Sequence, residues 1–190
     1  MEETGPDAQQ YLRQPDDGEL VRRARGGDAA AFHELVNRHA QPLFGLAYTL
    51  LGNAHDAEDV VQETFAGAFR SLRTFEHRSS VRTWLSRILV NQAALHRRRQ
   101  GPIRMKSLEH STAIPIEPGS ASAGVDAKLD LIAALQKLTD EHRAVIVLRE
   151  IERMSYDEMA QVLNVPRGTV ESRLHRARAE LKELLRSWVQ

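Results

Sequence analysis

Apolar residues recur every three or four positions along most of this chain, and no segment shows the apolar–polar alternation of a half-buried strand. Asp28 is placed to cap a helix that runs to about Arg38. Pro42 suits the first turn of a second helix, and Gly52 is placed to end it. The pattern therefore predicts an all-α fold.

Two longer helices are expected next. Asn53 is placed to cap the first, over 54–75, and regular apolar spacing there predicts one buried stripe. The stripe consists of Ala57, Val61, Phe65, Ala68 and Leu72. After the polar break "EHRSS", the second helix is expected over 81–99. Its apolar line consists of Val81, Leu85, Ile88, Leu89 and Leu95.

The periodicity fails over 101–125, where Gly, Pro and Ser accumulate, so this segment is predicted to be a flexible linker between two small helical bundles. Fully extended, it would reach about 80 Å. The predicted organisation is a disordered acidic tail over 1–17, a front bundle over 18–100, the linker over 101–125 and a rear bundle over 126–190.

The rear bundle carries the best-defined helix start of the chain. Helices are expected over 126–138 and 140–153, the second capped by Thr139. Ser155 and Glu158 then have the spacing of a capping box, and Met154 and Met159 have that of a hydrophobic staple. The spacing predicts a short helix from 156 to about 164.

The end of the chain has the pattern of a helix-turn-helix. Such a unit needs a small residue on its first helix, a turn residue tolerant of left-handed backbone and an apolar anchor on its second helix. Ala160, Asn164 and Val170 meet these needs in order. Pro166 marks the start of the last helix, which is expected to run to about Trp188.

The last helix has a predicted buried face, formed by Val170, Leu174, Ala177, Leu181 and Leu184. The opposite face suits contact with DNA bases and phosphates, and the alternative is a solvated face of a bundle helix. Its outward residues are Thr169, Ser172, His175 and Arg176, flanked by Arg167, Arg173 and Arg178.

Charge is balanced overall, with 26 basic and 26 acidic residues, but it is unevenly distributed. Residues 66–106 hold ten Arg or Lys and one acid, a net charge of +9, which suits phosphate binding. The absence of cysteine excludes disulfides and thiolate metal sites. No apolar run is long enough to cross a bilayer and the first residues are acidic, so a cytoplasmic protein without membrane insertion is expected.

Catalysis by this chain is not expected, and neither is a cofactor. The stretch "HELVNRH" resembles a zinc-protease motif, but its histidines, His33 and His39, are six residues apart instead of four. No phosphate-binding loop or nucleophile elbow is present. Asp56, Asp59 and Glu63 offer a metal site as one alternative, which we do not favour because nothing nearby completes the shell.

Three segments carry a family resemblance: "DAEDVVQETF" (56–65), "SSVRTWLSRILVNQAALHRRR" (79–99) and "LREIERMSYDEMAQVLNVPRGTVESRLHRAR" (148–178). From about Gly18 onward, the chain resembles the bacterial alternative sigma factors of the extracytoplasmic-function group. The resemblance implies that the front bundle is sigma region two, which docks on core RNA polymerase and opens the minus-ten promoter element. It implies that the rear bundle is sigma region four, which reads the minus-thirty-five element.

The resemblance also implies site residues. Contact with core polymerase is expected from Asp56, Asp59, Val60 and Glu63. Minus-ten DNA is expected to meet Phe75, His77, Arg78, Ser79, Ser80, Arg82, Arg87, Asn91 and Arg98. Phe75 has an equally weighted alternative as a core residue, and Trp84 is interpreted as core. The minus-thirty-five element is expected to meet Arg167, Thr169, Ser172, Arg173, His175 and Arg176.

The partners implied by the resemblance are core RNA polymerase, promoter DNA both as duplex and as melted strand, and an anti-sigma factor. Strand separation costs a few kcal/mol per unstacked step, so a second DNA-binding surface beside the helix-turn-helix is needed. The alternative function is a stand-alone helix-turn-helix regulator of duplex DNA, with the front bundle as a sensor or dimerisation domain.

Overall fold

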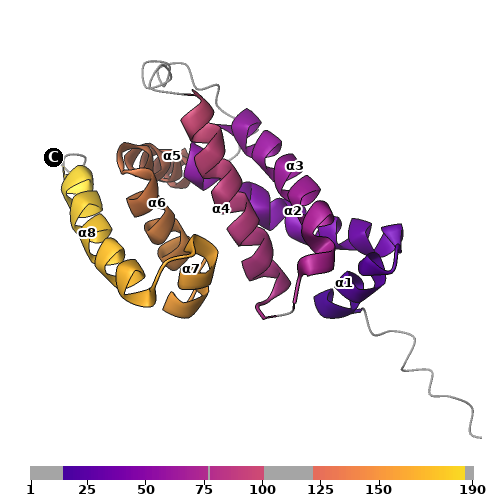
Figure 1. Ribbon diagram of the computed structural model, residues 1–190. Coiled ribbons are helices and arrows are strands. Elements are labelled where there is room, and N and C mark those ends of the chain that lie inside the picture. Colours follow the sequence, from indigo (N-terminus) through magenta and orange to yellow (C-terminus); the bar gives the residue numbers. More distant parts are fainter. Residues whose placement is uncertain (1–14, 77, 101–121, 187–190) are drawn as a thin grey trace, which may run out of the picture.

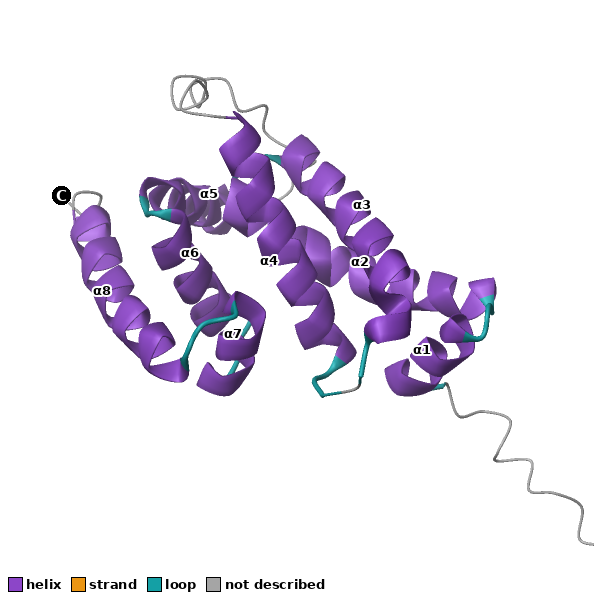
Figure 2. Cartoon of the chain, in the orientation of Figure 1, coloured by secondary structure: helices purple, strands orange, loops and turns teal. Residues whose placement is uncertain are grey.

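The computed structural model describes residues 15–76, 78–100 and 122–186, and this part of the chain contains helices and no strand. The helices form two bundles that lie side by side, α1 to α4 in one and α5 to α8 in the other (Figure 1, Figure 2). The predicted all-α fold with two small bundles is confirmed. Among the described helices, none is long and apolar enough to cross a membrane.

The front bundle contains α1 (Asp17–Arg25), α2 (Ala29–Leu51), α3 (Ala54–Ser71), a 3-10 turn η2 (Leu72–Thr74) and α4 (Val81–Gln100). α2 packs against α1, α3 and α4, and α3 packs against α4. Asp28 and Asn53 cap α2 and α3 as expected, each accepting a bond from a first-turn amide. Gly52 ends α2 with a left-handed φ of 73°.

The start of the front bundle differs from the expectation. Residues 1–14 of the predicted acidic tail lie outside the described residues. However, the side chain of Asp16 accepts a hydrogen bond of 2.8 Å from the amide of Glu19, and α1 begins at Asp17. The expectation that the tail lacks structure up to residue 17 is therefore wrong at its end, because a side-chain cap starts a helix there.

Pro42 does not start a helix. It lies inside α2, which continues without interruption across the position where two helices were expected. Leu35 on one side of the proline and Leu43 and Leu46 on the other are all buried in the core. Packing on both sides of Pro42 thus stabilises one helix in spite of the hydrogen bond that proline cannot donate.

The apolar stripe of α3 is largely as predicted. Ala57, Phe65, Ala68 and Leu72 are buried, and Val61 is half-buried. On α4 the core positions are Val81, Leu85, Leu89 and Ala93, whereas Leu95 is 39% exposed. The expectation for Leu95 is wrong because it lies six residues after Leu89, on another side of the helix.

The rear bundle contains α5 (Ser122–Lys137), α6 (Asp140–Ile146), a π-helical turn η5 (Val147–Ile151), α7 (Tyr156–Leu163) and α8 (Arg167–Arg186). Most of the predicted linker, 101–121, lies outside the described residues, and α5 begins before residue 126. The side chain of Thr139 caps α6 as expected. Met154 and Met159 are both buried in the core, in agreement with the predicted staple.

Arg143 anchors the rear bundle from its interior, where it is only 1% exposed. Its guanidinium donates to the carbonyl oxygens of Leu135 and Leu138, at 2.8 and 2.7 Å, near the end of α5. Burial, together with the nearby charge of Arg97, lowers the pKa of Arg143 to about 10. The arginine remains charged at neutral pH and satisfies carbonyl groups that end a helix.

The two bundles touch along two lines. α4 packs against α7, and α2 packs against α5. At the first contact, Arg82 of α4 forms an ion pair of 2.6 Å with Glu152. At the second, Arg97 lies 2.8 Å from Asp140, and Gln136 donates to the carbonyl of Thr49 at 3.1 Å.

Candidate nucleic-acid interface

The helix-turn-helix is built as the spacing predicts. The hydroxyl of Ser155 accepts from the amide of Glu158, and the carboxylate of Glu158 accepts from the amide of Ser155 at 2.8 Å, which completes the capping box. α7 ends at Asn164, whose φ of 52° is left-handed. Val170, Leu174 and Ala177 are then buried and fix which side of α8 faces the core.

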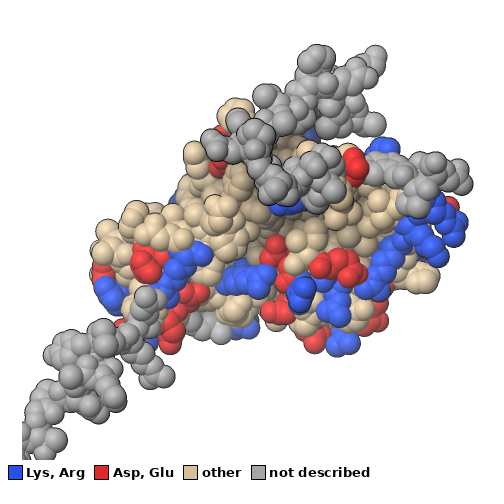
Figure 3. Space-filling model, turned by 180° about the vertical axis from the view of Figure 1, so that it is seen from behind, with Lys and Arg blue, Asp and Glu red and all other residues tan. Residues whose placement is uncertain are grey.

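The outward face of α8 is open to solvent at three of its four predicted positions. Ser172, His175 and Arg176 are exposed, and Thr169 is half-buried. Within the described part of the chain, His175 and Arg176 have no hydrogen bond or ion pair, so both side chains are available to a ligand. Seen from behind, a row of Lys and Arg side chains lies along the edge that α8 occupies (Figure 3). This face is suited to DNA.

All three arginines expected beside this face are engaged by carboxylates, Arg178 by Glu150. Arg167 lies 2.9 Å from Glu171 and 3.3 Å from Asp157, and the hydrogen bond to Glu171 raises the pKa of Arg167. Arg173 pairs with Glu141 of α6 at 2.9 Å. DNA phosphates would have to replace these carboxylates, so Arg167 and Arg173 are poorer candidates for DNA contact than Arg176.

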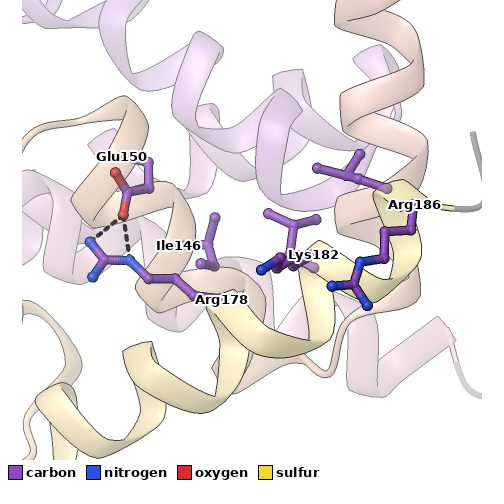
Figure 4. Close-up of a pocket in the computed structure, with 7 residues that line it drawn as sticks. Ile146, Glu150, Arg178, Lys182 and Arg186 are labelled. Carbon is purple, nitrogen blue, oxygen red and sulfur yellow. Dashed lines mark hydrogen bonds and ion pairs between the residues drawn. The ribbon is translucent and has the colours of Figure 1, made fainter. Parts of the chain in front are cut away.

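A groove lies farther along α8, between this helix and α6 with η5 (Figure 4). It has a volume of about 710 Å³, and Ile146, Leu181 and Leu185 give it an apolar lining. Arg178 and Glu150 form an ion pair of 2.6 Å at one end. Leu181 and Leu185 are only half-buried because of this groove.

The residues around the loop before α4 that are expected to contact melted DNA differ in their exposure. Phe75 is only 5% exposed, and its ring lies 4.6 Å from that of Trp84, between centroids, in the front core. Its core interpretation is therefore favoured over a base-binding role. Arg78 is exposed and pairs with Glu76 at 2.8 Å. His77 lies outside the described residues.

Ser79 and Ser80 lie at the end of this loop, half-buried and exposed respectively. The hydroxyl of Ser80 accepts a hydrogen bond of 3.0 Å from the amide of Thr83, at the beginning of α4. Ser80 therefore caps the start of α4, and this structural role explains the residue without any contact to DNA.

One side of α4 forms a basic and polar surface. Arg87, Asn91 and Arg98 are exposed and share a face because they are four and seven residues apart. In the residues that the structure covers, none of the three has a hydrogen bond or ion pair, so this α4 face is free for phosphates. Arg82 lies on another side of α4, where Glu152 holds it. The structure thus brings three of the four predicted α4 residues together.

The acidic residues of α3 do not form one cluster. Asp56 is 7% exposed and lies 3.2 Å from both His96 and the amide of Gln100 on α4. Val60 is also buried, at 2% exposed. Of the four residues expected to contact core polymerase, only Asp59 and Glu63 are exposed. No group of three metal-ligating side chains occurs among the described residues, and Asp56 cannot join its neighbours without leaving the core.

Sequence reasoning missed an aromatic residue on the exposed surface of α3. Phe69 is 62% exposed, and its ring lies 5.1 Å from that of Phe32 in an edge-on arrangement. Aromatic residues are enriched at protein interfaces, so Phe69 is a candidate contact for a partner protein. The signal was present in the sequence, because Phe69 falls outside the α3 stripe that contains Phe65 and Leu72.

Comparisons with known proteins identify both bundles. The family model of sigma-70 region 2 matches residues 35–103, and that of sigma-70 region 4 matches residues 128–181. The chain is 43% identical over 174 residues to the ECF RNA polymerase sigma factor SigE of Mycolicibacterium smegmatis, which covers 88% of this chain and 67% of the relative. It is 31% identical over 177 residues to the ECF RNA polymerase sigma factor SigW of Bacillus subtilis, and this match covers 87% of this chain and 95% of SigW.

A solved structure agrees with these matches. It is the sigma factor RpoE from Bartonella quintana in complex with the anti-sigma factor NepR, with 31% identity and a TM-score of 0.65. The match covers 82% of this chain and 96% of the solved chain. The two family models match in order along the chain, the relatives match over most of both lengths, and the fold is shared. The chain therefore belongs to the ECF RNA polymerase sigma factors.

Proposed function

We propose that this protein is an alternative sigma factor that binds core RNA polymerase, directs it to specific promoters and promotes strand opening. The observation that carries the proposal is the match to sigma regions 2 and 4 in order on one chain. The phosphodiester chemistry belongs to the polymerase, and the sigma factor contributes binding. Its expected place of action is the cytoplasm.

The rear bundle is proposed to read the minus-thirty-five element. α8 would lie in the major groove, with Arg176 and His175 toward the bases and Ser172 and Thr169 nearer the backbone. The exposure of the first two side chains and their lack of partners in the described structure support this assignment. Arg167 and Arg173 would reach phosphates only by exchanging carboxylate partners.

The front bundle is proposed to hold the melted minus-ten strand along α4. Arg87, Asn91 and Arg98 would follow the phosphates of a displaced strand, since they form a continuous exposed line. Arg78 and the loop around it would add charge where the strand leaves the duplex. Phe75 is left out of this role because it is buried.

The outer surface of α3 is proposed to dock on core polymerase. Asp59 and Glu63 supply negative charge there, and Phe69 supplies an exposed apolar anchor. Such a combination gives both orientation and contact area at a protein interface. Asp56 and Val60 would act indirectly, by holding α3 in place.

An anti-sigma factor is proposed as a further partner. The support is the solved complex of RpoE from Bartonella quintana with NepR, whose chain shares 31% identity with this one. Binding of such a protein would compete with polymerase or DNA for the same bundles.

The proposal is tested by measuring duplex promoter affinity with and without core polymerase. The expected result is weak binding by the protein alone and tight, specific binding once core is added. The alternative, a stand-alone helix-turn-helix regulator, predicts tight duplex binding by the protein alone with no change on addition of core. That second result would overturn the proposal.

A further inference from the structure

A glycine occupies the second position of α8, the helix proposed to enter DNA. This residue, Gly168, is exposed to solvent. Glycine is a poor residue for a helix, because it loses more conformational freedom on folding than any other residue. It usually meets one of three needs: a left-handed backbone, close packing against another part of the protein, or close approach of a ligand. The structure allows each of these needs to be checked at Gly168.

The backbone does not require glycine at this position. Among the described residues, the glycines with a positive φ are Gly27, in the turn after α1, and Gly52, at the end of α2. Gly168 instead lies within the regular helix α8, whose backbone angles any residue except proline adopts easily. A left-handed backbone is therefore not the reason for this glycine.

Close packing does not require glycine either. Within the described part of the chain, a β-carbon at Gly168 would have no atom outside its own helical turn within 4 Å. The contrast is Gly67 of α3, where a β-carbon would lie 3.3 Å from Cγ2 of Ile88 on α4. Tight contact between two helices accounts for Gly67. It does not account for Gly168, which leaves the close approach of a ligand.

The open space at Gly168 faces the side of α8 where DNA is proposed to lie. Gly168 comes four residues before Ser172 and seven before His175, so the three share one side of the helix. Val170 and Leu174, on the other side, are buried in the core. In a helix-turn-helix, residues near the start of the second helix are those that contact base edges. The missing side chain is thus at the end of the outward face that comes nearest to DNA.

We propose that Gly168 sets how closely the start of α8 approaches DNA, because the absence of a side chain leaves room for the duplex. The inference rests on the proposed function and adds a residue to its minus-thirty-five site. Any other residue would project at least a methyl group toward the duplex and would hold Ser172 and Arg176 farther from it. Hydrogen bonds to bases tolerate only a few tenths of an ångström, so these contacts would weaken. Glycine here costs helix stability and favours DNA binding.

The test is that one substitution should change stability and DNA binding in opposite directions. Gly168→Ala should raise Tm by about 1–3 °C, because alanine is a better helix former. The holoenzyme formed with core polymerase should bind a duplex promoter fragment about fivefold or more weakly, because the added methyl group crowds the interface. The fragment is taken from a start site that the wild-type protein directs. A fall in Tm would show that the fold itself needs this glycine and would overturn the proposal.

Gly45→Ala is the matched control. Gly45 is also exposed and lies inside the helix α2, where a β-carbon would again have no atom outside its own helical turn within 4 Å among the described residues. Gly45→Ala should therefore raise Tm and leave the affinity for the promoter fragment unchanged. An equal loss of affinity in both variants would mean that a stiffer helix, and not lost space, weakens binding. That result would overturn the proposal.

A larger side chain tests whether the effect depends on position along α8. Gly168→Leu should weaken binding at least as much as Gly168→Ala, without lowering Tm, since leucine is also a good helix former. Ala179→Leu adds bulk to the same exposed side of α8 about 16 Å farther along the helix, so it should change binding much less. Equal losses in the two leucine variants would show that bulk anywhere on this face is harmful, which would contradict a specific role for Gly168.

The wild-type holoenzyme separates this inference from the proposed function. If it fails to bind any promoter fragment, the proposed function is wrong and the inference falls with it. If it binds and the Gly168→Ala holoenzyme binds equally well, the proposed function stands and the inference alone is overturned.

Discussion

The rings of Phe75 and Trp84 pack against each other inside the front bundle, with centroids 4.6 Å apart and planes inclined by 33°. Phe75 precedes the loop expected at melted DNA, yet it is 5% exposed and Trp84 packs against the same core. The pair therefore fixes the end of α3 relative to α4. Bases of a melted strand would meet the loop after Phe75 and not this ring.

Phe75 is expected to matter for stability more than for DNA. Phe75→Ala should lower the free energy of unfolding by about 3 kcal/mol, because it leaves a cavity beside Trp84. Urea unfolding followed by Trp fluorescence measures this loss. Phe75→Leu keeps most of the volume and should retain promoter opening. A Leu variant that is stable yet fails to open promoters would show that the ring contacts DNA.

Arg176 is expected to contribute to binding of the minus-thirty-five element and not to binding of core polymerase. Arg176→Ala should weaken binding to minus-thirty-five DNA about tenfold, since an arginine that contacts a base contributes on the order of 1–3 kcal/mol. Lys182→Ala is the matched control, because it removes an equal charge from an exposed position of the same helix that lies about 9 Å farther from the helix start, away from the residues expected at the bases. Binding of both variants to core polymerase should equal that of the wild type. Loss of core binding by Arg176→Ala would indicate a structural role instead.

Phe69 is expected to anchor the contact with core polymerase. Phe69→Ala should weaken core binding by about tenfold or more, because a central aromatic residue often dominates a protein interface. Thermal unfolding should change little, since the side chain is 62% exposed. Phe65→Ala is the contrasting variant, because Phe65 is buried and its loss should lower stability first. Unchanged core affinity in Phe69→Ala, measured by fluorescence anisotropy, would remove this residue from the interface.

The capping box is expected to make stability depend on pH. Hydrogen bonds from the amide and hydroxyl of Ser155 hold the pKa of Glu158 below its ordinary 4.5. The unfolded state therefore takes up a proton first as pH falls, so the stabilisation is complete above about pH 4.5 and is lost as pH falls through the lower folded pKa. Glu158→Gln keeps a capping side chain without the charge. Urea unfolding of both proteins between about pH 7 and 3.5 should show the advantage of wild type shrinking with acid, and a constant difference would contradict the assignment.

Local signals in the sequence predicted the local structure well. The capping box at Ser155 and the left-handed Asn164 were both readable, because each depends on residues within one helical turn. Pro42 was misread because proline fits a first helical turn and also survives inside a helix that is packed on both sides. Leu95 was misread because it was added to a stripe with which its spacing does not agree.

Contacts between segments that are far apart in the chain could not be predicted from the sequence. Asp56 was grouped with Asp59 by position on one helix, but His96 and Gln100 of another helix draw it inward. Arg82 was assigned to melted DNA through the family resemblance, and its partner Glu152 lies 70 residues away in the other bundle. Helical periodicity indicates which residues share a face of a helix, but it does not indicate which other segment that face contacts.

Transcription in vitro shows whether this protein acts as a sigma factor. Purified core polymerase is combined with this protein and genomic DNA of its source, and the starts of the transcripts are mapped. We expect defined start sites that share two upstream elements and are absent without the protein. They should be lost when the exposed α4 face is neutralised by Arg87→Ala with Arg98→Ala. Start sites that do not depend on the protein, together with tight duplex binding in the absence of core, would contradict this expectation.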